Sequence, residues 1–150
     1  MKLFFDTSTL VAALVADHPH HDVARPWLAR LGHGRMEGAL CAHSLAELYS
    51  VLSAMPLRPR PSTDEVLQLL VESVLPRMRV IELGQADYQR ALELCARRRL
   101  RSGAIFDALI EVAARKAKAR HLVTLNPNDF ERFSEDAAAW IVDPRTTKPR

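Results

Sequence analysis

The sequence has little of what marks membrane, secreted or disulfide-stapled proteins. Its longest apolar stretch, residues 10–16, is far shorter than the roughly 20 residues that a membrane-spanning helix needs. Asp6 interrupts the apolar N-terminus almost at once, so we expect no signal peptide. Cys41 and Cys95 are too few and too far apart for a disulfide framework, and we expect two buried free thiols. These absences favour a cytoplasmic protein.

The composition is that of a globular domain. The chain has 150 residues, of which 48% are hydrophobic and 26% charged, and it contains no low-complexity tract. This length predicts one domain, at residues 1–143, followed by a flexible tail at residues 144–150. The net charge of +3 mildly favours a polyanionic partner. Basic residues cluster at 97–101 and 115–120. Each cluster could contact a polyanion, and a solvated helix face explains it equally well.

Short apolar segments alternate with amphipathic ones along the chain. We expect strands at residues 2–5, 39–42, 79–83, 121–125 and 140–142. Helices are expected at residues 9–16, 20–31, 44–54, 62–76, 85–99 and 104–119, with a short one after 126–130. Gly32, Gly34 and Gly38 mark a turn between the second helix and the second strand. The alternation predicts an α/β fold, with a mainly parallel central sheet of four to five strands flanked by helices.

Acidic side chains follow three of the predicted strands. Asp6 comes directly after the first strand, Glu47 lies in the helix after the second, and Asp129 lies in the turn after the fourth. Taken singly, each has a structural explanation. Asp6 can cap a helix, Ser44 and Glu47 match a capping box, and Asp129 is an ordinary turn residue.

Asp107 is harder to explain as a structural residue. It lies among apolar neighbours in the segment Ala104-Ile105-Phe106-Asp107-Ala108-Leu109-Ile110, on a helix that should be largely buried. A buried carboxylate needs a partner, which is either an arginine or a divalent cation shared with other carboxylates.

The four acids are more informative together. Sites in parallel sheets form beyond the carboxyl ends of the strands, so these acids are expected at one edge. Four carboxylates there would repel each other without a cation. Ligation by oxygen alone suits Mg²⁺ or Mn²⁺ better than zinc. We therefore interpret Asp6, Glu47, Asp107 and Asp129 as a candidate catalytic metal site.

Four motifs, in this order and spacing, resemble the PIN-domain family, and specifically its VapC-type toxins. The motifs are Asp6-Thr7-Ser8, Ser44-x-x-Glu47, Gly103-Ala104-Ile105-Phe106-Asp107-Ala108-Leu109-Ile110 and Val123-Thr124-x-Asn126-x-x-Asp129-Phe130. The resemblance spans nearly the whole chain, and the last two motifs together are its most specific part.

The resemblance implies a PIN-like fold and a metal-dependent endoribonuclease, the toxin of a toxin–antitoxin pair. Asp6, Glu47 and Asp107 match the acidic metal-binding positions of the family, and Asp129 matches the acid of the last motif, with Asn126 beside it. Hydroxyl positions that line the pocket are matched by Thr7 or Ser8 and by Thr124. The implied cofactor is Mg²⁺ or Mn²⁺, and the implied partners are an RNA substrate, a cognate antitoxin and a second copy of the chain.

Other interpretations fit the residues less well. A phosphoaspartyl transferase using Asp6 lacks a second nearby acid and a lysine after the later strands, and no P-loop is present. A non-catalytic PIN module for RNA binding or dimerisation remains an alternative, although the acids at positions 6, 47 and 107 are intact. We expect His18, His20 and His21 to be a solvated cluster rather than a metal site, and Trp27 and Trp140 to lie in the core or an interface.

Overall fold

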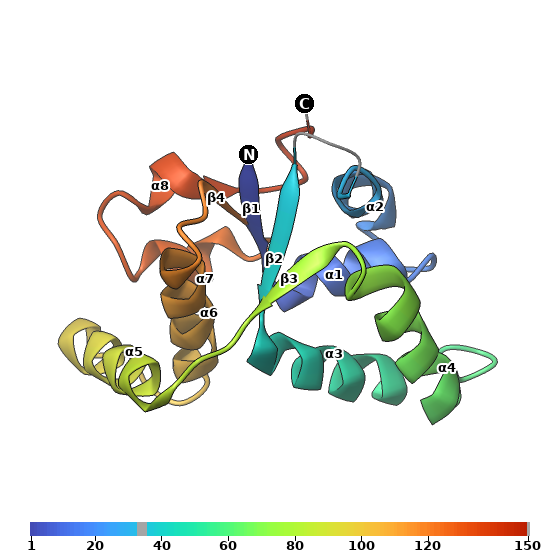
Figure 1. The fold of residues 1–150 in the computed structure, drawn as a ribbon, viewed down its shortest axis with the longest axis horizontal. Helices are drawn as coiled ribbons and strands as arrows, with labels where there is room; N and C mark the ends of the chain where they lie inside the picture. Colours follow the sequence, from blue (N-terminus) through green and yellow to red (C-terminus); the bar gives the residue numbers. More distant parts are fainter. Residues whose placement is uncertain (33–35, 150) are drawn as a thin grey trace.

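The computed structural model describes residues 1–32 and 36–149, except for the side chain of Ala138 (Figure 1). Its centre is a five-stranded sheet in the order β3-β2-β1-β4-β5, and every neighbouring pair is parallel. The strands are β1 (Lys2–Phe5), β2 (Glu37–Cys41), β3 (Met78–Ile81), β4 (His121–Val123) and β5 (Ile141–Val142). The predicted α/β fold with a parallel sheet is confirmed.

Helices cover both faces of the sheet, as parallel crossovers require. One face carries α1 (Thr7–Leu14), α2 (His21–Ala29), α3 (Ala42–Ala54) and α4 (Thr63–Leu69), which continues into the π-helical turn η1 (Leu70–Val74). The other face carries α5 (Gln85–Arg98), α6 (Ala104–Lys116), α7 (Pro127–Glu131) and α8 (Ala137–Trp140). No helix in the described ranges is both long and apolar enough to cross a membrane.

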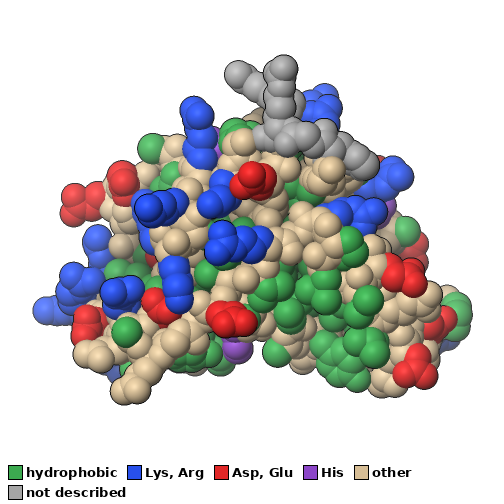
Figure 2. All heavy atoms as spheres, in the orientation of Figure 1, with side chains coloured by type: hydrophobic (Ala, Val, Ile, Leu, Met, Phe, Trp, Pro, Cys, Tyr) green, Lys and Arg blue, Asp and Glu red, His purple; other side chains and the backbone are tan. Residues whose placement is uncertain are grey.

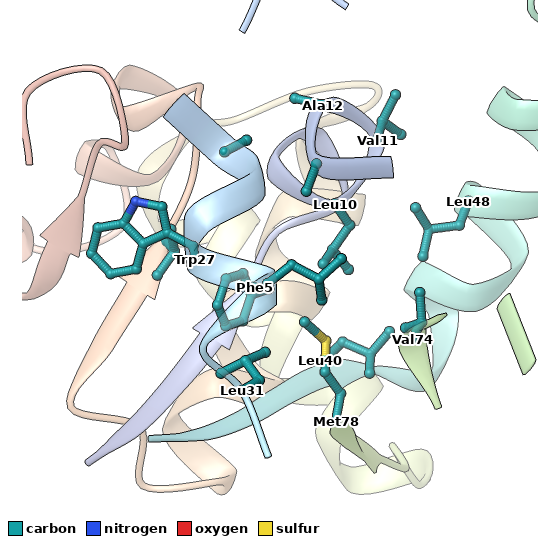
Figure 3. Close-up of a cluster of buried hydrophobic side chains, with 14 of the residues drawn as sticks. Phe5, Leu10, Val11, Ala12, Trp27, Leu31, Leu40, Leu48, Val74 and Met78 are labelled. Atoms are coloured by element: carbon teal, nitrogen blue, oxygen red, sulfur yellow. The ribbon is translucent and has the colours of Figure 1, made fainter. Parts of the chain in front are cut away.

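Alternating side chains of the strands divide the interior into two cores. Leu3 and Phe5 of β1 point into the core beneath α1–α4, where Figure 3 shows Phe5 among Leu10, Trp27 and Leu31. Phe4 points into the other core, beneath α5–α8. All three β1 side chains are fully buried, which explains the uninterrupted apolar run at residues 3–5. Because β1 is the central strand, this burial fixes the position at which Asp6 leaves the sheet.

The predicted core and thiol residues are also confirmed. The Trp27 and Trp140 side chains are buried in the two cores. Cys41 and Cys95 are free and buried. A capping box between Ser62 and Glu65 is present at the start of α4, with both reciprocal hydrogen bonds.

Two local predictions are wrong. Ser44 does not cap α3, because the helix begins directly after β2 with Cys41 at the N-cap position, so Ser44 and Glu47 form no capping box. Gly38 lies inside β2 rather than in a turn, at a point where a Cβ atom would come within 2.6 Å of Leu31 Cδ1. Gly32 does turn the chain, with φ of +82° after α2. Gly34 lies outside the described residues.

The direction in which successive strands are added to the sheet reverses between β1 and β4. The chain runs from β1 to β2 and β3 on one side, and then crosses to β4 and β5 on the other. In open parallel sheets, ligands bind at such a switch point, beyond the carboxyl ends of the strands. Register pairs Phe5 with Val123, so residue 6 and residue 124 leave the sheet side by side.

The segment after β5 packs against the domain. Asp143 begins a turn, in which its carbonyl oxygen accepts hydrogen bonds from the backbone amides of Thr146 and Thr147 at 3.1 and 3.0 Å. Pro144 and Pro149 are buried, and the Pro149 carbonyl accepts a hydrogen bond from the Arg30 guanidinium. The sequence suggested a flexible tail at residues 144–150. In the structure, residues 144–149 of this segment pack against α2 and the switch-point edge.

Candidate active site

An open pocket of about 470 Å³ lies at the switch point. Its wall is formed by side chains from the residue after β1, from α1, the α1–α2 connection, α3, α6, the β4–α7 connection and the segment after β5. They are Asp6, Thr7, Ser8, Val11, His18, His20, Glu47, Val51, Asp107, Leu125, Asn126 and Arg145. The structure thus brings three of the four predicted acids into one pocket, although they are separated by up to a hundred residues in the chain.

Asp6 occupies the N-cap position of α1 but does not cap the helix with its side chain. Its Oδ2 instead accepts hydrogen bonds from the hydroxyls of Ser8, at 2.5 Å, and Thr124, at 2.8 Å. Burial raises the pKa of Asp6, and these two hydroxyls partly oppose that effect. The helix-cap explanation therefore does not account for this carboxylate, which is held in place by Ser8 of α1 and by Thr124, directly after β4.

Hydroxyl groups also fix the backbone around Asp6. Ser8 Oγ accepts a hydrogen bond from the amide of Leu125 at 3.2 Å. Thr124 Oγ1 accepts one from the amide of Asn126 at 3.0 Å. Each hydroxyl therefore donates to the carboxylate and accepts from the chain after β4. This network ties the β4–α7 connection to Asp6.

Glu47 reaches the pocket from the second turn of α3. Its Oε1 lies 3.1 Å from His43 Nε2, but it is buried and makes no hydrogen bond of good geometry within the described residues. Burial raises the pKa of Glu47, the nearby His43 lowers it, and the charge of Asp6 raises it again. His43 in turn stacks on Phe106 of α6, with ring centroids 5.2 Å apart. This stack holds α3 and the start of α6 together at the pocket.

Asp107 lies in the first turn of α6, and its side chain is 27% exposed. Its carboxylate pairs with Arg132, whose Nη2 lies 3.2 Å from Oδ2. The structure thus shows the arginine partner that a half-buried aspartate needs. Even so, burial raises the pKa of Asp107 to about 7, and the charges of Asp6 and Asp129 add to that effect. One arginine does not balance the negative charge around this residue.

Asp129 and Asn126 occupy different places. Asn126 lines the pocket, whereas Asp129 lies in α7 outside its wall, with a side chain that is 49% exposed. Asp129 Oδ1 lies 3.4 Å from the same Arg132 nitrogen that contacts Asp107. Asp129 is therefore linked to the pocket residue Asp107 by their shared contact with Arg132, but it does not line the pocket itself. Asn126 is the residue of the last motif that does.

The pocket also contains groups that the sequence did not point to. His18 and His20, expected to be solvated, are half-buried and line the pocket together with Arg145. These residues come from a loop and from the segment after β5, and neither carries a motif. A cue available in the sequence was Asp143, which follows the last strand as Asp6 follows the first.

The second basic cluster does not lie at the pocket. Arg115 pairs with Glu111 and lies over the Trp140 ring, and Lys116 pairs with Asp87. These residues occupy the last turn of α6, roughly 12 Å or more along the helix from Asp107 at 1.5 Å per residue. These contacts explain Arg115 and Lys116 as structural, whereas the cluster at residues 97–101, before α6, remains a candidate for contact with a polyanion.

Within residues 1–32 and 36–149, no three histidine, cysteine or acidic side chains are close enough together to hold one metal ion in the observed conformation. The donor chemistry nevertheless fits a hard divalent cation, because the acids supply oxygen ligands only. A buried Glu47 oxygen lacks a hydrogen bond, and the pKa values of Asp6, Glu47 and Asp107 are all raised. Burial is the main cause of all three shifts, and a bound cation would favour the ionised form of each carboxyl.

Comparison with protein families finds the PIN domain over residues 3–136. Among curated proteins, the chain is 32% identical to ribonuclease VapC27 of Mycobacterium tuberculosis over 78% of this chain and 80% of that protein. It is 31% identical to ribonuclease VapC40 of the same organism over 78% of this chain and 81% of that protein.

Solved structures show the same fold. The crystal structure of VapC20 from Mycobacterium tuberculosis, a sarcin-ricin loop cleaving toxin, matches with a TM-score of 0.63 at 20% identity, over 91% of this chain and 93% of that one. VapBC2 from Rickettsia felis, solved with a DNA fragment from its promoter, matches with a TM-score of 0.65 at 23% identity, over 95% and 98%. The family match covers all four acids and most of the chain. The chain therefore belongs to the PIN domain family and is of the VapC type.

Proposed function

We propose that the chain is an endoribonuclease that depends on Mg²⁺ or Mn²⁺. The observation that carries this proposal is the convergence of Asp6, Glu47 and Asp107 on one open pocket at the switch point of a PIN fold. The names of the relatives, ribonuclease VapC27 and VapC40, support RNA as the substrate. The PIN family match, over residues 3–136, includes the segments that carry the acids.

Asp6, Glu47 and Asp107 are the residues that would hold the cation, directly or through water. When bound, the cation would lower the pKa of a water molecule and neutralise charge on the phosphate oxygens. Asp6 is held rigidly by Ser8 and Thr124, which spares it the entropy cost of being ordered during the reaction.

Arg132 and the last motif complete the proposed machinery. Arg132 pairs with Asp107 in the observed conformation, so loading the site requires that this carboxylate exchange its partner. The released guanidinium would then be free to donate to a phosphate oxygen. We keep Asp129 as the fourth acid because it shares Arg132 with Asp107, and we propose Asn126 as a pocket amide that orients water or substrate.

We further propose that the protein is the toxin of a toxin–antitoxin pair, works in the cytoplasm, forms a homodimer, and has a single domain over residues 1–143. Solved neighbours of this fold include toxin–antitoxin complexes, which supports the antitoxin. Leu67, Val71 and Leu75 are exposed on α4, η1 and the turn after it. Figure 2 shows hydrophobic side chains gathered over the region where Figure 1 draws α4. An apolar patch of this kind suits a protein partner.

A cleavage assay with matched variants tests the proposal. Purified protein, freed of any antitoxin, is incubated with a mixed cellular RNA pool in Mg²⁺, in Mn²⁺ and in EDTA. Asp107→Asn removes one pocket charge, whereas Asp64→Asn makes the same change at an exposed position on α4. We expect cleavage by the wild type and by Asp64→Asn with either metal, no cleavage in EDTA, and a loss of at least about a hundredfold in Asp107→Asn.

Each outcome decides a part of the proposal. Cleavage that persists in EDTA or in Asp107→Asn contradicts the metal-dependent mechanism. RNA that is bound but left intact under every condition supports a non-catalytic module and contradicts the enzyme.

A further inference from the structure

The wall of the pocket also contains basic side chains. Arg145, His18 and His20 line the same open space as Asp6, Glu47 and Asp107. The proposed metal site does not use them. They come from two segments, the α1–α2 connection and the chain after β5, which lie far apart in the sequence and both line this pocket.

Arg145 is pre-oriented by Asp143, which follows β5 at the same edge of the sheet. Its Nε lies 3.0 Å from both carboxylate oxygens, and its Nη2 lies 2.7 Å from Oδ2. The backbone amide of Arg145 also donates to Asp143 Oδ1 at 2.9 Å. Across residues 1–32 and 36–149, Nη1 has no hydrogen-bond partner, so both of its N–H groups remain available to a ligand.

The two histidines are also ordered by their neighbours. His18 Nδ1 accepts a hydrogen bond from the backbone amide of His20 at 3.1 Å, which leaves Nε2 to carry the proton of the neutral ring as a donor. The ring centroids of His18 and His20 lie 5.8 Å apart. His21 anchors the same loop to α1 by its contact of 2.9 Å with the carbonyl oxygen of Ala12.

We propose that Arg145, His18 and His20 form a subsite for an RNA phosphate next to the one that is cleaved. The inference rests on the proposed ribonuclease function and names a substrate contact for that site. A planar guanidinium with two free donors fits a phosphate oxygen, and an imidazole N–H adds a second donor. The pairing with Asp143 keeps Arg145 from collapsing onto Asp6 or Glu47, so it remains available to an anion that enters an otherwise acidic pocket.

RNA binding in EDTA tests this subsite without requiring cleavage. The probe is a short fluorescein-labelled single-stranded RNA, and anisotropy gives Kd at several salt concentrations for the full chain. Arg145→Gln removes the cation, Arg145→Lys keeps it, and Lys148→Gln removes a positive charge from the same segment at an exposed position outside the pocket.

We expect Arg145→Gln to weaken binding about fivefold to tenfold, and to reduce the slope of log K against log salt by about 0.7, the value for one phosphate contact in a single strand. Arg145→Lys should restore the slope, and Lys148→Gln should change Kd less than twofold. In cleavage, Arg145→Gln should raise KM and leave kcat nearly unchanged, because this contact is made equally before and during the reaction.

The double variant His18→Asn, His20→Asn provides a second test that leaves the pair of Asp143 and Arg145 intact, in case Arg145→Gln disturbs the segment after β5. It should weaken binding about threefold or more at pH 6 to 7. If both variants bind RNA within twofold of the wild type with an unchanged salt slope, the proposed subsite is contradicted. This holds even if Asp107→Asn abolishes cleavage and so supports the nuclease mechanism. If Asp107→Asn cleaves normally while Arg145→Gln loses affinity, the proposed mechanism fails and the RNA subsite stands.

Discussion

Replacing Asp107 with asparagine should make the protein more stable at alkaline pH when no metal is present. In the folded protein, burial and neighbouring acids raise the pKa of this carboxyl from 3.8 to about 7. Below pH 3.8 the group is protonated in both the folded and the unfolded state, so it has no effect on stability there. Between pH 3.8 and 7 the unfolded chain releases the proton more readily, and stability falls as pH rises.

The size of this effect follows from the raised pKa. One pKa unit corresponds to about 1.4 kcal/mol, so holding Asp107 ionised above pH 7 costs the fold at most about 4 kcal/mol. The side chain is 27% exposed, and relaxation around it brings the expected cost to about 2–4 kcal/mol. For a domain of this size, 1 kcal/mol shifts Tm by about 2–4 °C, so Asp107→Asn should raise Tm by roughly 4–15 °C at pH 8.

Thermal unfolding in EDTA, followed by circular dichroism from pH 5 to pH 8, measures this difference. The gain in Asp107→Asn should grow up to pH 7 and then level off, and Asp64→Asn should stay within about 0.5 kcal/mol of the wild type. Mn²⁺ should raise the Tm of the wild type and close much of the gap, because only the wild type keeps the full set of carboxylates. If Asp107→Asn is no more stable than the wild type at pH 8, the pocket does not hold the excess negative charge that we infer.

Three further substitutions test other parts of the account, each by urea or thermal unfolding. Thr124→Val removes the hydroxyl that donates to buried Asp6, and should lower the free energy of unfolding by about 1–3 kcal/mol at pH 7. Thr124→Ser should recover most of this loss, and a Val variant as stable as the wild type would contradict the network. Gly38→Ala places a Cβ atom 2.6 Å from Leu31 Cδ1 and should lower the free energy of unfolding by about 1–3 kcal/mol. A change below about 0.5 kcal/mol would mean that β2 or Leu31 shifts easily, and would contradict the close packing at this glycine. Asp87→Asn should destabilise the protein at pH 7, because hydrogen bonds from Lys116 and from the Gly84 amide lower the pKa of Asp87 in the folded state. This loss should shrink as pH falls from 3.8 through the lowered pKa, so a loss that stayed constant down to low pH would contradict the ionised pair.

The fold and the acidic pocket were predictable because both follow from short patterns. Uninterrupted apolar strands between amphipathic helices predict a parallel sheet, and parallel strands end at a common edge. Asp6 is fixed by its place directly after such a strand. Asp107 is marked by its apolar neighbours, which made a plain surface role improbable.

Other features depended on geometry that the sequence does not carry. Ser44 and Glu47 match a capping box, yet β2 passes into α3 without a loop, so the helix begins two residues before Ser44. Gly38 resembles a turn residue, but its role is the close approach of Leu31 and Met78 to β2.

The basic groups of the pocket wall were missed for the same reason. The α1–α2 connection and the segment after β5 carry no periodic pattern, so His18, His20 and Arg145 could be placed only once the sheet order was known. Their convergence depends on β5 pairing with β4 at the edge of the sheet, a long-range contact that local propensity does not specify.

The central claim is that Asp6, Glu47 and Asp107 together make one cation site, and Mn²⁺ binding measured by electron paramagnetic resonance tests it most directly. Wild-type protein at pH 8 is titrated with Mn²⁺ alongside Asp6→Asn, Glu47→Gln, Asp107→Asn and the exposed control Asp64→Asn. We predict saturable binding by the wild type and by Asp64→Asn, competition by Mg²⁺, and a loss of affinity of tenfold or more in each pocket variant. Equal affinity in the wild type and all three pocket variants, or no binding by the folded wild type, would contradict it.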